Sequence, residues 1–179
     1  MLNFFKKDKK TPEPKEVIPE RIKQIKPIVT NLVELRKPCV PVEKGEDVSQ
    51  IIQELKDTLE TKRGWGLSAN QIGYNKKISY IKIPEFKDKQ GNFSYKEYIL
   101  INAKIIEKDR LVKVLDEGCL SFPGVPVHTQ RYVFITIEYL NEKMEPITMA
   151  YQDMEALAMQ HEVDHQQGRT IFDRKWRAR

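Results

Sequence analysis

Two histidines and a glutamate near the C-terminal end of the 179-residue chain have the spacing of a metal site. In the segment His161-Glu162-Val163-Asp164-His165 the histidines are four positions apart, so on a helix they lie on one face, one turn apart. Both imidazoles could bind one ion, and Glu162, about 100° round the helix, could reach a water on that ion. This His-Glu-x-x-His pattern is typical of zinc hydrolases, with two ligands and a general base. A solvated helix with two chance histidines is the weaker alternative, because the chain has only three histidines.

A catalytic site of this kind needs a third protein ligand and one open coordination position. Two common sources lie downstream: a histidine six residues after the second histidine, or a glutamate on a following helix. Both are excluded, because that position is Ile171 and no glutamate follows His165. The upstream candidates are Cys119, His128 and Cys39. We prefer Cys119, because its glycine and proline neighbours could present its side chain and a thiolate with two imidazoles suits iron, zinc, nickel or cobalt.

The composition indicates one globular domain. Hydrophobic residues make up 40% of the chain and charged residues 32%, and no apolar run approaches the ~20 residues of a membrane span. The N-terminus has charge but no apolar region of a secretory signal, and two cysteines do not make a disulfide framework. We therefore expect a cytoplasmic protein that binds neither membrane nor DNA, and we expect a monomer.

The positive charge of the chain is concentrated at its two ends. Residues 1–26 hold eight Lys/Arg against four Asp/Glu, and residues 169–179 hold five against one, although the whole chain carries only +5. Residues 1–24, with lysines and three prolines, predict a basic flexible or extended arm, and residues 25–179 predict a single catalytic domain. Solvated tails are the common explanation for such ends, and attraction to RNA or another polyanion is the alternative.

Apolar spacing predicts two helices. The first has its N-cap at Asp47 and runs to about Lys62, with a core stripe of Val48, Ile51, Ile52, Leu55 and Leu59. The second begins at Asp153 and stops before Gly168. Its stripe holds Met154, Leu157, Ala158, His161 and His165, so we expect the histidines on the face that meets the core.

Period-two patterns predict strands at residues 77–83, 98–106, 132–140 and 147–151. Turn residues at 86–94 and 141–143 predict hairpins, so the pairing should be antiparallel. Residues 28–41 contain prolines and no long helical period, and predict a loop over the body. Residues 64–73 (Gly-Trp-Gly-Leu-Ser-Ala-Asn-Gln-Ile-Gly) indicate backbone held close to something, either in a tight turn or at a substrate cleft, and they do not match a phosphate loop.

Three segments together resemble the signature motifs of the peptide deformylases. They are residues 64–73, residues 117–121 (Glu-Gly-Cys-Leu-Ser) and residues 160–165 (Gln-His-Glu-Val-Asp-His), and the likeness extends from about residue 28 to residue 173. The resemblance implies an α+β fold with mainly antiparallel sheets around a central metal-bearing helix, and a second helix in the N-terminal half. It implies hydrolytic removal of the formyl group from the initiator methionine of nascent polypeptides, with release of formate. It also implies one divalent metal ion, natively Fe2+, with Zn2+, Ni2+ or Co2+ as substitutes.

The resemblance also assigns roles to residues. It implies Cys119, His161 and His165 as metal ligands, Glu162 as the acid/base, and Gln71 with the backbone N–H of Leu120 as donors to the developing oxyanion. Substrate-binding roles fall on Gly64, Trp65, Gly66 and Gly118, of which Trp65 and Gly118 would offer backbone hydrogen bonds to an extended peptide. Met154, Leu157 and Ala158 are expected to line the methionine pocket, although a core role suits the same residues. A metallopeptidase that cuts internal peptide bonds, and a protein with a structural metal, are the alternative classes.

Some positions depart from the usual family pattern. Trp65 stands where a β-branched residue is common, so we expect a reshaped cleft rim. Ser68 and Asn70 replace a common alanine and proline and are expected to matter little, and Gln166 replaces a leucine. The basic ends are the candidates for contact with the ribosome surface.

Overall fold

Five antiparallel strands form one sheet in the part of the chain that the computed structural model describes, residues 21–87, 91 and 93–178. The strands lie in chain order, β1-β2-β3-β4-β5, with each strand paired to the next. Their bounds are Gly66–Ser68 (β1), Ile78–Lys87 (β2), Phe93–Glu117 (β3), Val127–Leu140 (β4) and Pro146–Gln152 (β5). The predicted α+β class and the antiparallel pairing are confirmed, with a single sheet in place of several.

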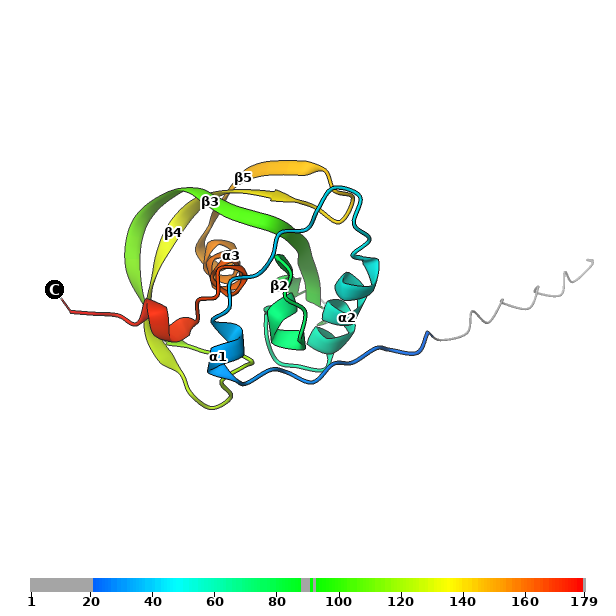
Figure 1. Cartoon of the computed structure of the whole chain (residues 1–179). Coiled ribbons are helices and arrows are strands. Elements are labelled where there is room, and N and C mark those ends of the chain that lie inside the picture. The colour runs from blue at the N-terminus through cyan, green and yellow to red at the C-terminus, as the bar shows by residue number, and fades with distance from the viewer. Residues whose placement is uncertain (1–20, 88–90, 92, 179) are drawn as a thin grey trace, which may run out of the picture.

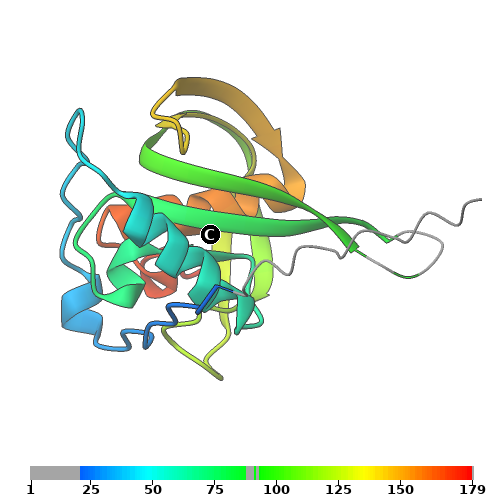
Figure 2. The same cartoon turned by 90° about the vertical axis from the view of Figure 1, so that its right-hand side faces the viewer.

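The sheet curves around one helix, α3, which runs over Asp153–Gln166 in the middle of the molecule (Figure 1). Turned by 90°, the same view shows β3 and β4 bending along their length as they pass α3 (Figure 2). Nine of the 14 residues of α3 are buried, polar ones included. In the described residues, no helix is long and apolar enough to cross a membrane.

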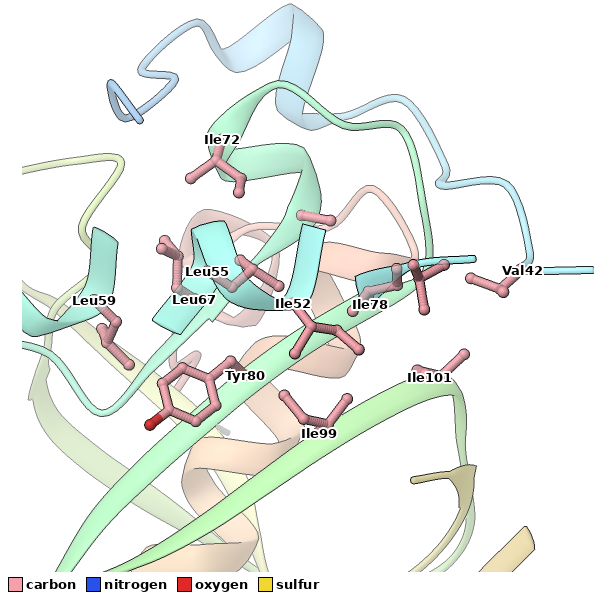
Figure 3. Close-up of a cluster of buried hydrophobic side chains, with 12 residues drawn as sticks. Val42, Ile52, Leu55, Leu59, Leu67, Ile72, Ile78, Tyr80, Ile99 and Ile101 are labelled. Carbon is pink, nitrogen blue, oxygen red and sulfur yellow. The ribbon is translucent and has the colours of Figure 1, made fainter. Parts of the chain in front are cut away.

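A second helix, α2 (Ser49–Glu60), packs on the opposite face of β2 and β3 from α3. Its buried stripe of Ile52, Leu55 and Leu59 meets alternate strand residues in one apolar cluster (Figure 3). The strand residues of this cluster are Leu67, Ile78, Tyr80, Ile99 and Ile101. Because successive strand side chains point to opposite faces, the intervening residues are left to face α3.

Those intervening residues form the second core cluster with α3. Ile81, Ile83 and Leu100 pack there against Met159 and Val163. The side of α3 that meets this core cluster is thus formed by Ala156, Met159 and Val163. Of the stripe predicted from the sequence, which contains both histidines, Ala158 alone belongs to the cluster. Met154 is 43% exposed. The face of α3 that carries His161 and His165 is therefore not part of this core cluster.

Strand β3 is much longer than its predicted stretch, residues 98–106. It spans 25 residues, and its register with β4 shifts at Ile101/Lys104, Ile105/Glu107 and Val114/Glu117. Its second half carries a charge at most positions and is mainly exposed, so no alternation of apolar residues marks it as a strand. Irregular register of this kind bends a strand and increases its twist, which suits a sheet that wraps a helix.

Two helix predictions need correction. The predicted loop at residues 28–41 contains a short helix, α1 (Leu32–Leu35), whose first turn is capped by the Asn31 side chain. Four residues are too few to leave a helical period. Helix α2 begins at Ser49 with Val48 at the N-cap position, and it ends at Glu60 rather than Lys62. Asp47 still accepts the Ser49 N–H at 2.9 Å.

Residues 21–26 lie along α2. The guanidinium of Arg21 and the N–H of Gln24 both donate to the Asp57 carboxylate, the latter at 2.7 Å, and the N–H of Lys26 donates to Thr58 Oγ1 at 2.9 Å. Most of the predicted arm, residues 1–20, lies outside the described residues. The end of that arm is therefore held to α2 through the buried Asp57 carboxylate and through an ion pair between Lys23 and Glu60.

Replacing Asp57 by asparagine should destabilise the fold in a pH-dependent way. The hydrogen bond from Arg21, with that from Gln24, lowers the pKa of Asp57 from 3.8 to about 2 against the effect of burial. The ionised carboxylate thus adds stability that is complete above pH ~4 and is lost as the pH falls toward ~2. The free energy of unfolding, measured in urea, should differ between wild type and Asp57→Asn at pH 7, and the difference should shrink across that window. Glu34→Gln, which removes an exposed ion pair with Lys37, should change little; an equal effect of both variants would contradict the prediction.

Candidate active site

The glycine-rich segment 64–73 forms β1 and the short 3-10 helix η1 (Ala69–Ile72) beside α3. A Cβ atom on Gly66 would lie 2.4 Å from Oε1 of Glu162, a distance that no side chain can adopt. The close backbone approach predicted for residues 64–73 is thus made by β1, and the group that it approaches is Glu162, the predicted acid/base. Glycine at position 66 leaves room for the Glu162 carboxylate, and a side chain there would force that carboxylate to move.

Helix α3 carries His161, Glu162 and His165 beside a large cleft. The two imidazole rings are 5.0 Å apart between centroids, as the i, i+4 spacing predicts. Glu162 and His165 are almost fully buried, and His161 and Glu162 line the cleft. The helix thus presents one ring and one carboxylate to the cleft, with the second ring behind them.

Cys119 follows β3 and lies against both histidines. Its Sγ atom is 3.3 Å from Nε2 of His165, and the ligand atoms of Cys119, His161 and His165 all lie within 4.8 Å of one another. Among the described residues this is the one cluster of at least three His, Cys, Asp or Glu side chains that could hold a metal ion. His128 is half exposed beside Asp116, and the sulfur of buried Cys39 lies 3.6 Å from the backbone carbonyl of His165 rather than in the cluster.

This donor set fits a divalent ion. Sulfur and imidazole nitrogen on a tetrahedral ion are about 3.5 Å apart, close to the 3.3 Å between Cys119 and His165. Nδ1 of His161 is 2.7 Å from Oε1 of Glu117, which leaves Nε2 of His161 for the cluster. Three protein donors with a carboxylate beside them, rather than four donors, are the pattern of a catalytic and not a structural site.

A buried ionic network behind His161 was not foreseen from the sequence. Glu117 accepts from His161 and from Arg131, and Arg131 also pairs with Asp164, which Arg174 holds from the C-terminal side. Arg131 is 2% exposed. These partners come from β3, β4, α3 and the 3-10 helix η2 (Ile171–Arg174). The one local feature of the sequence that pointed to this network was the position of Glu117, two residues before Cys119 in the same motif.

Replacing Glu117 by glutamine should weaken metal binding about 10- to 100-fold, the usual cost of losing the partner that orients a ligating histidine. The dissociation constant can be measured by competition with a chelator for Zn2+ or Co2+. Glu107→Gln is the matched control on the same strand, because exposed Glu107 accepts from the Thr136 hydroxyl at 2.8 Å and is no member of the donor cluster. An unchanged dissociation constant for Glu117→Gln would show that His161 needs no orienting carboxylate.

Gln71 and Leu120 lie on the other side of the sulfur. Nε2 of Gln71 is 3.6 Å from Cys119 Sγ and 3.1 Å from Ser121 Oγ, while its Oε1 accepts the Ser68 N–H at 2.8 Å. Gln71 is 1% exposed. Leu120 lines the cleft, and a Cβ on Gly64 would lie 3.1 Å from its side chain. The amide of Gln71 is thus fixed with its N–H groups toward the cluster.

The cleft has a volume of about 1250 Å³. All the predicted substrate-binding residues line it: Gly64, Trp65, Gly66, Gly118, Met154, Leu157 and Ala158. The carbonyl of Trp65 already accepts the Lys82 N–H at 2.7 Å. Because backbone groups alternate in direction along a strand, the N–H and C=O of Gly66 point to the unpaired edge of β1.

Burial and neighbouring charges act on the pKa values of the α3 side chains. Burial alone would lower the pKa of His161, but hydrogen bonds with Cys119 and Glu117 raise it to about 10. Burial lowers the pKa of His165 well below its usual value. Burial raises the pKa of Glu162, against the opposing effects of His161 and Ser68. A carboxyl group of raised pKa suits a residue that takes up and returns a proton near neutral pH.

A cysteine and two histidines beside a buried carboxylate, next to an open cleft, are the donor set typical of a metal-dependent hydrolase. The family model described as polypeptide deformylase matches residues 22–178. The chain belongs to the polypeptide deformylase family. The predicted enzyme class, removal of an N-formyl group, is confirmed, and the alternative of a metallopeptidase is not favoured.

Individual relatives agree with this assignment. A peptide deformylase of Elusimicrobium minutum is 41% identical over 142 residues, 78% of this chain and 80% of the relative. One from Aquifex aeolicus is 35% identical over 148 residues, 81% and 85% of the two chains. The crystal structure of a peptide deformylase from Legionella pneumophila superposes with a TM-score of 0.73 at 28% identity, covering 85% of this chain and 86% of the other.

Proposed function

We propose that this enzyme removes the formyl group from N-formyl-methionyl peptides, with Cys119, His161 and His165 holding a divalent ion and Glu162 acting as acid and base. The observation that carries the proposal is the three-donor cluster beside Glu162 at the cleft. When bound, the ion lowers the pKa of a water and polarises the formyl oxygen. The remaining chemistry belongs to side chains and backbone groups of this chain.

The peptide lies along the unpaired edge of β1 as an added strand. Gly66 takes the backbone role that was expected of Trp65, since the Trp65 carbonyl is engaged with Lys82. Gly118 lines the same cleft and offers backbone groups from β3's end. The methionine side chain enters between Met154, Leu157 and Ala158, whose apolar surface faces the cleft.

Proton transfer falls to Glu162. Its carboxylate takes a proton as a water oxygen bonds to the formyl carbon, and returns that proton to the amine nitrogen as the C–N bond breaks. The products are formate and a free methionyl amine. The Gln71 amide and the Leu120 N–H donate hydrogen bonds to the formyl oxygen as it gains charge, an effect worth about 3 kcal/mol per donor in other enzymes.

Anaerobic assay of the iron-loaded protein on formyl-Met-Ala-Ser, with formate as the readout, tests the function. Acetyl-Met-Ala-Ser is the control, and acetate release from it should be much slower than formate release from the formyl peptide. Cleavage of a protein substrate at internal peptide bonds, with the formyl peptide left intact, would replace this proposal by the metallopeptidase reading.

We propose Fe2+ as the native ion, with Zn2+, Ni2+ or Co2+ able to take its place. One thiolate with two imidazoles suits these borderline metals and is a poor site for Mg2+ or Ca2+. Metal analysis of protein purified without oxygen tests this assignment. A predominance of zinc in such a sample would contradict it.

We further propose that the enzyme works as a cytoplasmic monomer on nascent chains, and that its basic ends contact ribosomal RNA. The charge of residues 1–26 and 169–179 supports the contact. The division into an arm (1–24) and a catalytic domain (25–179) is part of this proposal. Ribosome co-sedimentation should fall when the basic ends are removed or when salt is raised; an unchanged result would refute the contact.

A further inference from the structure

A continuous run of buried hydrogen bonds leads from the end of α3 to the carboxylate of Glu162. Nε2 of Gln166 is 2.9 Å from Ser79 Oγ, Ser79 Oγ is 2.7 Å from Ser68 Oγ, and Ser68 Oγ is 2.6 Å from Glu162 Oε2. The exposed fractions are 0% for Gln166 and Ser79, 1% for Ser68 and 3% for Glu162. Each group is thus shielded from bulk water and depends on its protein partners.

The orientation of the Gln166 amide is fixed by two backbone groups. Its Oε1 accepts the Ala103 N–H at 3.1 Å, and its Nε2 donates to the Leu100 carbonyl at 3.0 Å. In the reverse orientation, the amide N–H of Gln166 would face the Ala103 N–H and its carbonyl would face the Leu100 carbonyl, so neither hydrogen bond could form. The second hydrogen of Nε2 is therefore the one that points at Ser79, which must accept it.

The direction of the remaining bonds follows from this. Since Ser79 Oγ accepts from Gln166, its own hydrogen is free to donate to Ser68 Oγ. Ser68 then accepts from Ser79 and has its own hydrogen for Glu162, whose Oε2 at 2.6 Å is much nearer than its backbone carbonyl at 3.3 Å. Every donor in the run points toward the carboxylate, and hydrogen bonds in such a series strengthen one another.

The two oxygens of Glu162 are thereby made unequal. Oε2 is held by the Ser68 hydroxyl on the buried side. Oε1 faces Gly66, where the absence of a side chain leaves it room. The departures at positions 68 and 166, one of which was expected to matter little, stand at two of the three donor positions in this run.

We propose that Ser68, Ser79 and Gln166 form a positioning relay that holds Oε2 of Glu162 as a hydrogen-bond acceptor and keeps Oε1 toward the cleft as the oxygen that exchanges the proton. None of the three relay residues touches the reacting atoms. The proposal rests on the proposed role of Glu162 as acid and base. It assigns a function to two buried hydroxyls and one buried amide.

Kinetics of the metal-loaded holoenzyme on formyl-Met-Ala-Ser test the relay. Ser68→Ala should lower kcat about 10-fold with KM unchanged, because a hydrogen bond to a charged group is lost from the group that moves the proton. Gln166→Leu should lower kcat severalfold, and the double variant should be no slower than Ser68→Ala alone, since both changes break one series. Ser68→Thr, which keeps the hydroxyl, should recover most of the rate.

Thr58→Val is the control, because Thr58 is a buried hydroxyl on α2 that accepts from the Lys26 backbone. It should lose stability and keep kcat. An unchanged kcat for Ser68→Ala, an effect on KM alone, or additive losses in the double variant would overturn the relay while formate release by the wild type upholds the proposed function.

Crystal structures of the metal-loaded wild type and Ser68→Ala decide the relay independently of any substrate. We expect one orientation of the Glu162 carboxylate in the wild type and several in the variant. A single, unchanged orientation in Ser68→Ala would overturn the relay even if the enzyme were to act on another substrate. Should Ser68→Ala fail to fold, Ser79→Ala breaks the same run one bond further from Glu162 and is judged by the same readout.

Discussion

Replacing Glu162 by glutamine is expected to lower kcat for formate release by about 10²- to 10⁴-fold, the usual contribution of a positioned general acid and base. The amide keeps the shape of the side chain and an oxygen for the Ser68 hydroxyl at the Oε2 position, but it cannot take up the proton of water. The fold and the metal content should stay as in the wild type, since Glu162 is no member of the three-residue donor cluster.

The matched control is Glu155→Gln on the same helix. Glu155 accepts the Tyr98 hydroxyl at 2.6 Å and pairs with Lys96, away from the metal cluster, so this variant should keep nearly all of the rate. Formate release at the wild-type rate by a metal-loaded Glu162→Gln variant would remove Glu162 from the proposed role. A loss of both rate and metal would instead make Glu162 a contributor to the metal site.

Replacing Cys119 by serine is expected to weaken metal binding by far more than the ~10- to 100-fold cost of losing an outer partner. A hydroxyl at neutral pH carries a proton and offers a poor ligand in place of a thiolate, and no other described side chain of the required type lies in the cluster. The protein should lose its ion on dialysis, and formate release should fall with the metal content. Metal analysis before and after dialysis measures this.

Cys39→Ser provides the same chemical change outside the cluster. Cys39 is buried in the loop that packs on the end of α3, and its sulfur meets a backbone carbonyl of His165 rather than a ring. This variant should lose stability and retain one ion per chain. Retention of the metal by Cys119→Ser through dialysis would mean that the ion is held without the sulfur, and the proposed donor set would be wrong.

Local patterns were enough to predict the parts of the site that are close in sequence. His161, Glu162 and His165 follow from one helical turn, whereas the glycines of residues 64–73 indicated close backbone approach and left open whether it served a tight turn or a cleft. Cys119 lies 46 residues from His165, so its place required the elimination of downstream ligands and the family resemblance. Its position beside both rings was open to prediction only because few residue types can serve as a third ligand.

Features that depend on pairing between distant segments escaped prediction. Arg131 looks like an ordinary strand residue, yet its guanidinium joins β3 to α3 from the interior. Ser68, which replaces a common alanine, was expected to matter little, and only its hydrogen bond to Glu162 in the folded chain distinguishes it. The outer half of β3 was missed because its side chains are charged and exposed, and its pairing with β4 is what makes it a strand.

Both ends of β3 border the same cleft. Phe93 and Tyr95 from its beginning, and Val114 to Glu117 from its end, all line the cavity, because the strand turns back on itself at its irregular positions (Figure 2). The shape of the opening therefore depends on how sharply one hydrogen-bonded strand is bent, together with the loop of residues 118–126 that also lines the cleft. The register of β3 with β4 shifts near Asn102. Inserting or deleting one residue there would change how the two ends of β3 lie relative to each other across the cleft.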